Sequence, residues 1–369
     1  MTPPATTQPE PLGKLGTPRS KAIRDLRERA IMASLVGCGV ITLGITLGIV
    51  FILIRETIGF FGLIDEDGQA MVTVRDFLFG LEWNPLLGQE KHFGIWPLIL
   101  GTLKVTIVAM AFALPVGLIA AVWLSEYAKP RVRAWIKPIL EVLAGIPTVV
   151  FGFFAVSFIT PVLLQWEWLQ VKARDANGDV LINAAGQPVM QAFNPLNFGS
   201  YNVMAAGLAV GVMCLPIVTS LTEDALRAVP RALREGSYGL GANKFETSVK
   251  VVVPAALSGV MAAFLLAIAR AVGETMIVAL AAGKQAIQLL TPSDDPKGGE
   301  TFDVGNAVAL NEPVQPMTGF IVSMFTGDVR VGSVEYYSSY AVAGTLFVMT
   351  LTITVVGNMI QKRFREKYD

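Results

Sequence analysis

The sequence contains only two cysteines and a single histidine among its 369 residues. Cys38 and Cys214 both lie within long apolar runs, so we expect neither a disulfide nor a Cys/His metal cluster. The phosphate-loop pattern G-x-x-x-x-G-K-[ST], the zinc pattern HExxH and any nucleophile beside a base are also missing. We therefore expect no metal site in this chain and no catalysis by it.

Charged side chains are scarce as well, at 16% of the chain, whereas hydrophobic residues make up 53%. The mean hydropathy is +0.56, and a soluble domain of this length would need more polar surface. Apolar windows of about 20 residues, the length that spans hydrocarbon, indicate a polytopic membrane protein. We predict an all-α fold with six transmembrane helices, at residues 31–54, 96–124, 139–164, 203–222, 256–283 and 339–360.

Basic and acidic residues are distributed unevenly between the two sets of loops. The first set carries 19 basic and 10 acidic residues, and comprises segments 1–30, 125–138, 223–255 and 361–369. The second set carries 8 basic and 17 acidic residues, and comprises segments 55–95, 165–202 and 284–338. Because cytoplasmic loops are enriched in Lys and Arg, the first set and both termini are predicted to be cytoplasmic. The Pro-rich and Thr-rich residues 1–20 are expected to be disordered.

Segment 223–255 is the most informative of the loops. It shows helical periodicity on both sides of a glycine-marked turn, with Leu226, Val229, Leu233 and Leu240 among charged neighbours. This pattern predicts a short surface helix at the membrane face. Such a helix would either rest on membrane lipid headgroups or dock into a groove of a cytoplasmic partner.

The same segment resembles the signature E-A-A-x3-G-x9-I-x-L-P of the ABC-importer permeases. The matching positions, with the spacing kept, are Glu235, Gly236, Ser237, Gly241, Val251, Val253 and Pro254. The resemblance implies that this segment is the coupling helix on which the ATPase subunits sit. It also implies the type I ABC-importer permease fold for about residues 96–283 and the last helix.

Two further stretches, LEVLAGIPTVVFGFFAV (140–156) and ARAVGETM (269–276), resemble the phosphate-specific permeases, and the GETM ending is similar to the PstC-type subunit. The resemblance implies one membrane subunit of an ATP-driven importer of inorganic phosphate in the bacterial plasma (inner) membrane. The implied partners are a second homologous permease, two cytoplasmic ATPase subunits and an external phosphate-binding protein. ATP and magnesium would be bound by the ATPase subunits, so this chain is expected to hold no cofactor; no nucleic acid is expected to bind.

Arg270 and Glu274 are two full charges inside an apolar run, one helical turn apart. A charge at the centre of a bilayer costs roughly 2.5–3.5 kcal/mol on insertion scales, so Arg270 must face protein or water. The two residues either pair with each other and lock helix packing or line the translocation path. Arg preceding Glu is the weaker order for an i,i+4 pair. Ionisable residues inside membranes are functional by default, which favours the path.

In the path hypothesis, the guanidinium of Arg270 offers an oxyanion two parallel donors. Glu274 would temper that attraction and would repel sulfate, which carries no proton near pH 7, more than phosphate. Thr275 could donate its hydroxyl. Lys104 is a weaker candidate, because it could equally extend toward the membrane surface or draw anions inward. Glu141 is expected at the cytoplasmic interface.

Three other functions are compatible with this pattern. The nearest is a permease of the same class for another oxyanion, such as sulfate, molybdate or phosphonate. An ion-coupled secondary transporter, with Glu274 as proton carrier, is disfavoured by the E-A-A-like segment. A membrane-embedded phosphate sensor that signals without transport is the third.

Overall fold

The computed structural model describes residues 18–64, 70–85, 91–164, 166–172, 190–193, 199–292 and 300–363. The expected disorder of residues 1–20 falls almost entirely outside these ranges. The chain divides into two compact units, Met1–Arg55 and Glu56–Asp369. The described part of the first unit is one helix, α1 (Pro18–Phe61), which continues into the second unit and contains the first predicted span.

The second unit is built around two long helices, α3 (Trp96–Val122) and α7 (Val203–Ala228). Small residues let their backbones approach: a Cβ on Gly211 would lie 2.9 Å from the carbonyl oxygen of Ala109, and one on Gly207 would lie 2.6 Å from Val108. Close packing of this kind is typical of membrane helices, where lipid supplies no hydrophobic drive for association. Asn202 caps α7 by accepting the N–H of Ala205 at 2.7 Å.

Four continuous helical spans are long and apolar enough to cross a membrane: Leu26–Phe61, Trp96–Tyr127, Val203–Ala228 and Val334–Arg363, the last being α15. All four are longer than the corresponding predicted spans, which are 31–54, 96–124, 203–222 and 339–360. Two further helix pairs pass the same test when each bent pair is counted as one span, which gives up to six. The described residues are thus consistent with the six spans predicted from the sequence.

The span predicted at 139–164 is sharply bent and consists of more than one helix. Helix α4 (Pro130–Ala144) ends inside this span. The next helix, α5 (Thr148–Phe154), begins after a bend of 89°. The cause is Pro147, which has no N–H to donate and disfavours helical backbone in the residue before it. The span then continues through η2, a π-helical turn (Ala155–Ile159), and α6 (Thr160–Leu164).

The span predicted at 256–283 is also not one continuous helix. It is divided into α11 (Leu257–Val272) and α12 (Met276–Ala281). At its other end, α11 meets a 71° bend after the run formed by α9 (Lys244–Thr247), the π-helical turn η3 (Ser248–Val252) and α10 (Val253–Ala255).

The sequence prediction of a plain loop at 284–338 missed an apolar helix, α14 (Met317–Thr326). Its ten residues are too few to span hydrocarbon. The same segment contains the strand pair β5 (Leu290–Pro292) and β6 (Glu300–Phe302), and the short helix α13 (Val304–Val308).

Aromatic side chains fill a separate core beside α14. Trp83 packs edge-on against Phe320, with ring centroids 4.9 Å apart, and Phe60 packs against Phe93 and Phe77. Edge-to-face contacts of this kind are a preferred aromatic geometry. They hold together α2 (Val74–Phe79), the strand pair β1 (Trp83–Asn84) and β2 (His92–Phe93), and the end of α1. The third strand pair is β3 (Trp166–Lys172) with β4 (Met190–Phe193).

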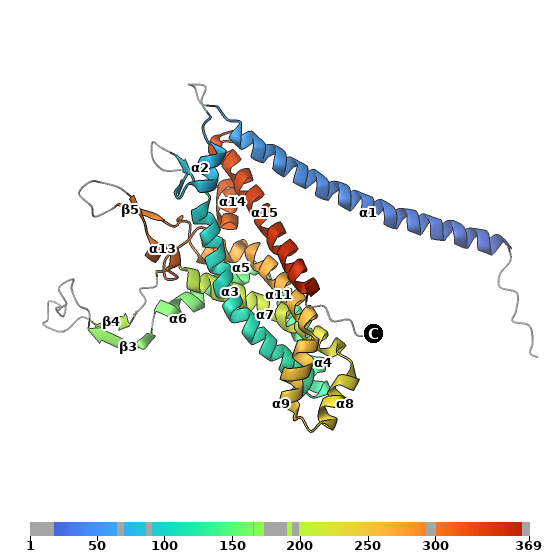
Figure 1. The fold of residues 1–369 in the computed structure, drawn as a ribbon. Helices are drawn as coiled ribbons and strands as arrows, with labels where there is room; N and C mark the ends of the chain where they lie inside the picture. The colour runs from blue at the N-terminus through green and yellow to red at the C-terminus, as the bar shows by residue number, and fades with distance from the viewer. Residues whose placement is uncertain are drawn as a thin grey trace, which may run out of the picture. The chain divides into compact units, whose positions relative to one another are not determined.

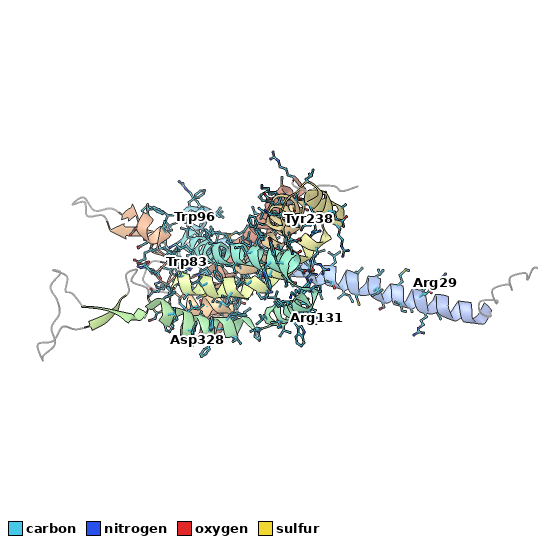
Figure 2. The ribbon with its side chains drawn as sticks, turned by 90° about the horizontal axis from the view of Figure 1, so that it is seen from below. Arg29, Trp83, Trp96, Arg131, Tyr238 and Asp328 are labelled. Atoms are coloured by element: carbon cyan, nitrogen blue, oxygen red, sulfur yellow. The ribbon has the colours of Figure 1, made fainter. Side chains whose placement is uncertain are left out.

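The described parts of segments 125–138 and 223–255 lie at one end of the second unit, and the α2 part of segment 55–95 lies at the other. Helices α4, α9 and α8 (Arg231–Gly239) gather at one end and α2 lies at the other (Figure 1). Figure 2 shows Arg131 and Tyr238 at the first end and Trp83, Trp96 and Asp328 at the second. For these described segments, the separation matches the division into basic and acidic loop sets.

Candidate translocation and coupling sites

Arg270 lies in the last turn of α11, 13 residues after its first residue, or about 20 Å along the helix axis. Its side chain is exposed on this single chain. Within the described part of the chain it makes no ion pair and no hydrogen bond. The helix ends just beyond it, where the N–H of Gly273 is bonded to the carbonyl oxygen of Ala269 at 3.2 Å.

Glu274 lies in the break between α11 and α12 and is buried, with 7% of the residue exposed. Its Oε1 accepts the backbone N–H groups of Met276 at 3.1 Å and Ile277 at 3.3 Å. These are among the N–H groups that the start of a helix leaves without an intrahelical partner. The carboxylate therefore caps α12, a role that the sequence analysis missed.

The hypothesis that Arg270 and Glu274 pair at helical i,i+4 spacing is not supported by this geometry. The chain leaves the helix between them, and Glu274 turns to the N-terminus of α12 instead. The two residues are only four positions apart in the sequence. They thus belong to one region of the protein, without forming an ion pair.

The break is held in place from α14 and α3. Thr318 of α14 donates its hydroxyl to the backbone carbonyl of Glu274 at 2.7 Å. Thr102 of α3 in turn accepts the N–H of Met317 at 3.0 Å. Thr275, the remaining path candidate in the break, is half-buried and donates its hydroxyl to the carbonyl oxygen of Gly273 at 3.2 Å.

Lys104 is buried in α3, and its ammonium group is occupied by backbone oxygens. Nζ donates to the carbonyls of Asn306 at 2.6 Å and Ala309 at 3.0 Å, at the end of α13. Lys104 therefore ties the 304–309 segment to α3. Its partners lie about 200 positions away in the sequence, which is why neither of the two predicted roles described this contact.

The motif residues form a compact turn of helices, which we call the motif segment (residues 229–256). Ser237 is buried and its hydroxyl lies 2.9 Å from that of Thr247, which joins α8 to α9. Gly241 follows α8 with φ +85°, a left-handed conformation that side chains disfavour. The motif glycine is therefore required by the turn itself. Asn243 and Glu246 then cap α9 reciprocally.

The other motif positions are divided between surface and interior. Glu235 and Gly236 are exposed on α8, Val251 and Val253 are half-buried, and Pro254 is exposed. Large apolar side chains stand at the tip of the segment: Leu240 is 92% exposed and Phe245 is 67% exposed. Exposed apolar groups on an otherwise charged segment indicate a contact surface.

A buried carboxylate near the motif segment was also missed by the sequence analysis. Glu223 of α7 is fully buried and lies within 4 Å of three basic side chains: Lys137 at 3.1 Å, Arg133 at 3.5 Å and Arg227 at 3.7 Å. Two of these come from α4, so the cluster attaches α4 to the end of α7. A buried charge needs such partners, because an unpaired one is strongly destabilising.

Comparison with known proteins agrees with this architecture. Residues 113–366 match the family described as binding-protein-dependent transport system inner membrane component. The chain belongs to this family. It is a permease subunit of an ABC importer, of the type that works in the inner membrane with ATPase subunits and a periplasmic binding protein. Proteins of this family are transporter subunits, and this subunit is not an enzyme.

Similar family members cover most of the chain. A phosphate transport system permease protein PstC from Xylella fastidiosa is 27% identical over 95% of this chain and 96% of that protein. A probable ABC transporter permease protein, YqgH of Bacillus subtilis, is 28% identical over 78% of each chain. Among solved structures, a bacterial alginate ABC transporter in complex with its pentasaccharide-bound periplasmic protein aligns with a TM-score of 0.55. It covers 94% of this chain and 99% of that one at 13% identity, which supports the fold alone.

Proposed function

We propose that this chain is one of two permease subunits of an ATP-driven importer of inorganic phosphate, and that it forms half of the translocation path. The relatives described as phosphate transport permeases, which match along nearly the whole chain, support phosphate as the substrate. The orientation that we propose places both termini and the 223–255 loop in the cytoplasm, with segments 55–95, 165–202 and 284–338 outside.

The observation that carries this proposal is Arg270. It is an exposed guanidinium well inside an apolar helix, without a partner in the described residues. Leaving it in lipid would cost roughly 2.5–3.5 kcal/mol. A water-filled path shared with a second subunit removes that cost and presents paired donors to an oxyanion.

The capping geometry refines the role proposed for Glu274. Its Oε1 holds α12, so the carboxylate is fixed beside the path rather than free to follow the substrate. A fixed negative charge would keep the bound anion from being trapped by Arg270. Thr275 is a further candidate lining residue. Lys104 is a minor one, because two of its three donors are already bonded to carbonyls.

Coupling to ATP hydrolysis is assigned to the motif segment. Its exposed face, with Glu235, Gly236, Leu240 and Phe245, would bind the ATPase subunits. The sequence also allowed α8 to rest on lipid headgroups, and the proposal does not require that contact. ATP binding would close the ATPase subunits, and the segment would carry that movement to the membrane helices.

The test is labelled phosphate uptake in cells without their own phosphate importers, expressing this chain with its neighbouring subunits. Arg270→Gln is compared with Arg131→Gln, a matched change at an exposed arginine at the α8 end of the second unit. We expect uptake to require ATP, to vanish in assembled Arg270→Gln and to persist in Arg131→Gln. Normal uptake by assembled Arg270→Gln would contradict the path assignment. Transport of sulfate or molybdate in place of phosphate by the wild type would contradict the substrate.

A further inference from the structure

The end of α3 is not α-helical. It finishes in a π-helical turn, η1 (Trp123–Tyr127), and π-helical turns are frequent at functional sites. Three basic side chains from three other helices converge on this turn: Arg234 of α8, Lys244 of α9 and Arg133 of α4. Two of these three helices belong to the motif segment.

Arg234 makes the most specific of these contacts. Its Nη2 lies 2.9 Å from Oε1 of Glu126 and its Nε lies 3.4 Å from Oε2, so the guanidinium meets both carboxylate oxygens. Both side chains are largely buried, with 16% and 7% exposed. The same guanidinium donates to the carbonyls of Val229 at 2.7 Å and Leu226 at 2.8 Å. One side chain thus fastens α8 to the ends of both α3 and α7, and paired charged hydrogen bonds of this type also fix orientation.

The other two cations secure the same turn from different sides. Nζ of Lys244 lies 4.9 Å from the ring centroid of Tyr127, within the range of a cation–π contact. Arg133 donates to the carbonyls of Leu124 at 3.3 Å and Ser125 at 3.1 Å, and its Nε is 3.5 Å from Glu223. The turn is therefore contacted by α8 and α9 of the motif segment and by α4.

We propose that η1 is the element through which movement of the motif segment reaches α3, with Glu126–Arg234 as the deciding contact. This inference rests on the proposed function, because it assumes that the motif segment is moved by the ATPase subunits. Glu126 and Arg234 are positioning residues for transport and touch no substrate. Since α3 packs closely against α7 along Gly207 and Gly211, displacement of η1 shifts both central helices together.

Glu126→Gln tests the contact, because it removes the charge while keeping the shape. Glu141→Gln is the matched control: it makes the same chemical change at an exposed residue of α4 that has no partner in the described residues. The complete complex is reconstituted in vesicles, and ATP hydrolysed is measured against inorganic phosphate imported. We expect Glu126→Gln to keep its ATPase subunits and to import at least about fivefold less phosphate per ATP, the lower end of typical site-to-site coupling. Glu126→Asp should recover part of the ratio, and Glu141→Gln should match the wild type.

An unchanged ratio in Glu126→Gln would overturn the proposal. Loss of the ATPase subunits from this variant would also overturn it, because the contact would then serve docking alone.

A second measurement does not depend on the substrate. Spin labels replace the exposed Ile119 on α3 and Ala232 on α8, in a chain carrying Cys38→Ser and Cys214→Ala. In otherwise wild-type protein the distance between the labels should stay the same with and without ATP and vanadate, because both helices move as one body. In Glu126→Gln it should change on nucleotide binding. A nucleotide-dependent distance without the Glu126 substitution would refute the relay. A wild type that imports no phosphate would refute only the proposed substrate.

Discussion

Replacing Glu274 by glutamine and by alanine separates its two tasks, capping α12 and placing a negative charge beside Arg270. Glutamine keeps a side-chain oxygen that can accept the N–H groups of Met276 and Ile277, whereas alanine keeps none. Hydrogen bonds to a charged acceptor contribute about 1.5–3 kcal/mol and neutral ones about 1 kcal/mol. The observed distances of 3.1 and 3.3 Å favour the lower end of that range.

We therefore expect Glu274→Gln to lower the stability of the assembled complex by about 1 kcal/mol and Glu274→Ala by about 3 kcal/mol. The measurement is thermal unfolding of the purified complex in detergent. Only the charge matters for selectivity, so both variants should raise sulfate uptake relative to phosphate uptake by a similar factor. Equal stability of the two variants would refute the capping role. An unchanged ratio of the two anions in assembled protein would refute the electrostatic role.

Three further predictions follow from the geometry. Lys104→Met leaves the carbonyls of Asn306 and Ala309 without their donor. The variant should be less stable by about 2–3 kcal/mol, and proteolysis within 304–309 should be faster. Lost uptake at unchanged stability would instead place Lys104 on the path. In Gly241→Ala a residue with a side chain must adopt φ +85°, at a cost of about 1–2 kcal/mol. We expect less of the ATPase subunits to co-purify with this variant. Full co-purification would show that the turn tolerates a Cβ. Gly211→Ala places a Cβ 2.9 Å from the carbonyl oxygen of Ala109. This overpacking should destabilise the protein by about 1–3 kcal/mol and lower its unfolding temperature. The control Gly44→Ala, whose Cβ meets nothing within 4 Å, should leave the unfolding temperature unchanged.

Local sequence signals predicted the parts of the fold that depend on neighbouring residues. Apolar length identified the membrane helices, and the E-A-A-like spacing located α8, whose terminating Gly241 has the conformation that the turn demands. The breaks were less visible, because long apolar runs stand on both sides of Pro147 and of Gly273–Thr275, and an average over about 20 residues hides so short an interruption. Pro147 was a usable signal for the first break, and the Gly-Glu-Thr sequence, with its glycine and a cap-competent side chain, was one for the second.

Contacts between distant segments could not be predicted in this way. Lys104 is bonded to carbonyls about 200 positions further along the chain, and Arg234 is bonded to Glu126, 108 positions away. Periodicity reports only which face of a helix is apolar, and it does not identify the residue that meets a given charge. The assumption of one continuous helix also placed Arg270 and Glu274 on one face, whereas the carboxylate turns to cap α12.

The exposed position of Arg270 has a consequence for biogenesis. A newly inserted copy without its proposed partner subunit exposes the guanidinium of Arg270. This charge lies about 20 Å along a hydrophobic helix. If Arg270 lines a path shared with a second permease, as proposed, such a copy should be less firmly held by the bilayer than an assembled one, and membrane quality-control proteases should degrade it faster. Surplus copies made by unbalanced synthesis should then be short-lived, and Arg270 would help to keep this chain and the proposed second permease in equal number.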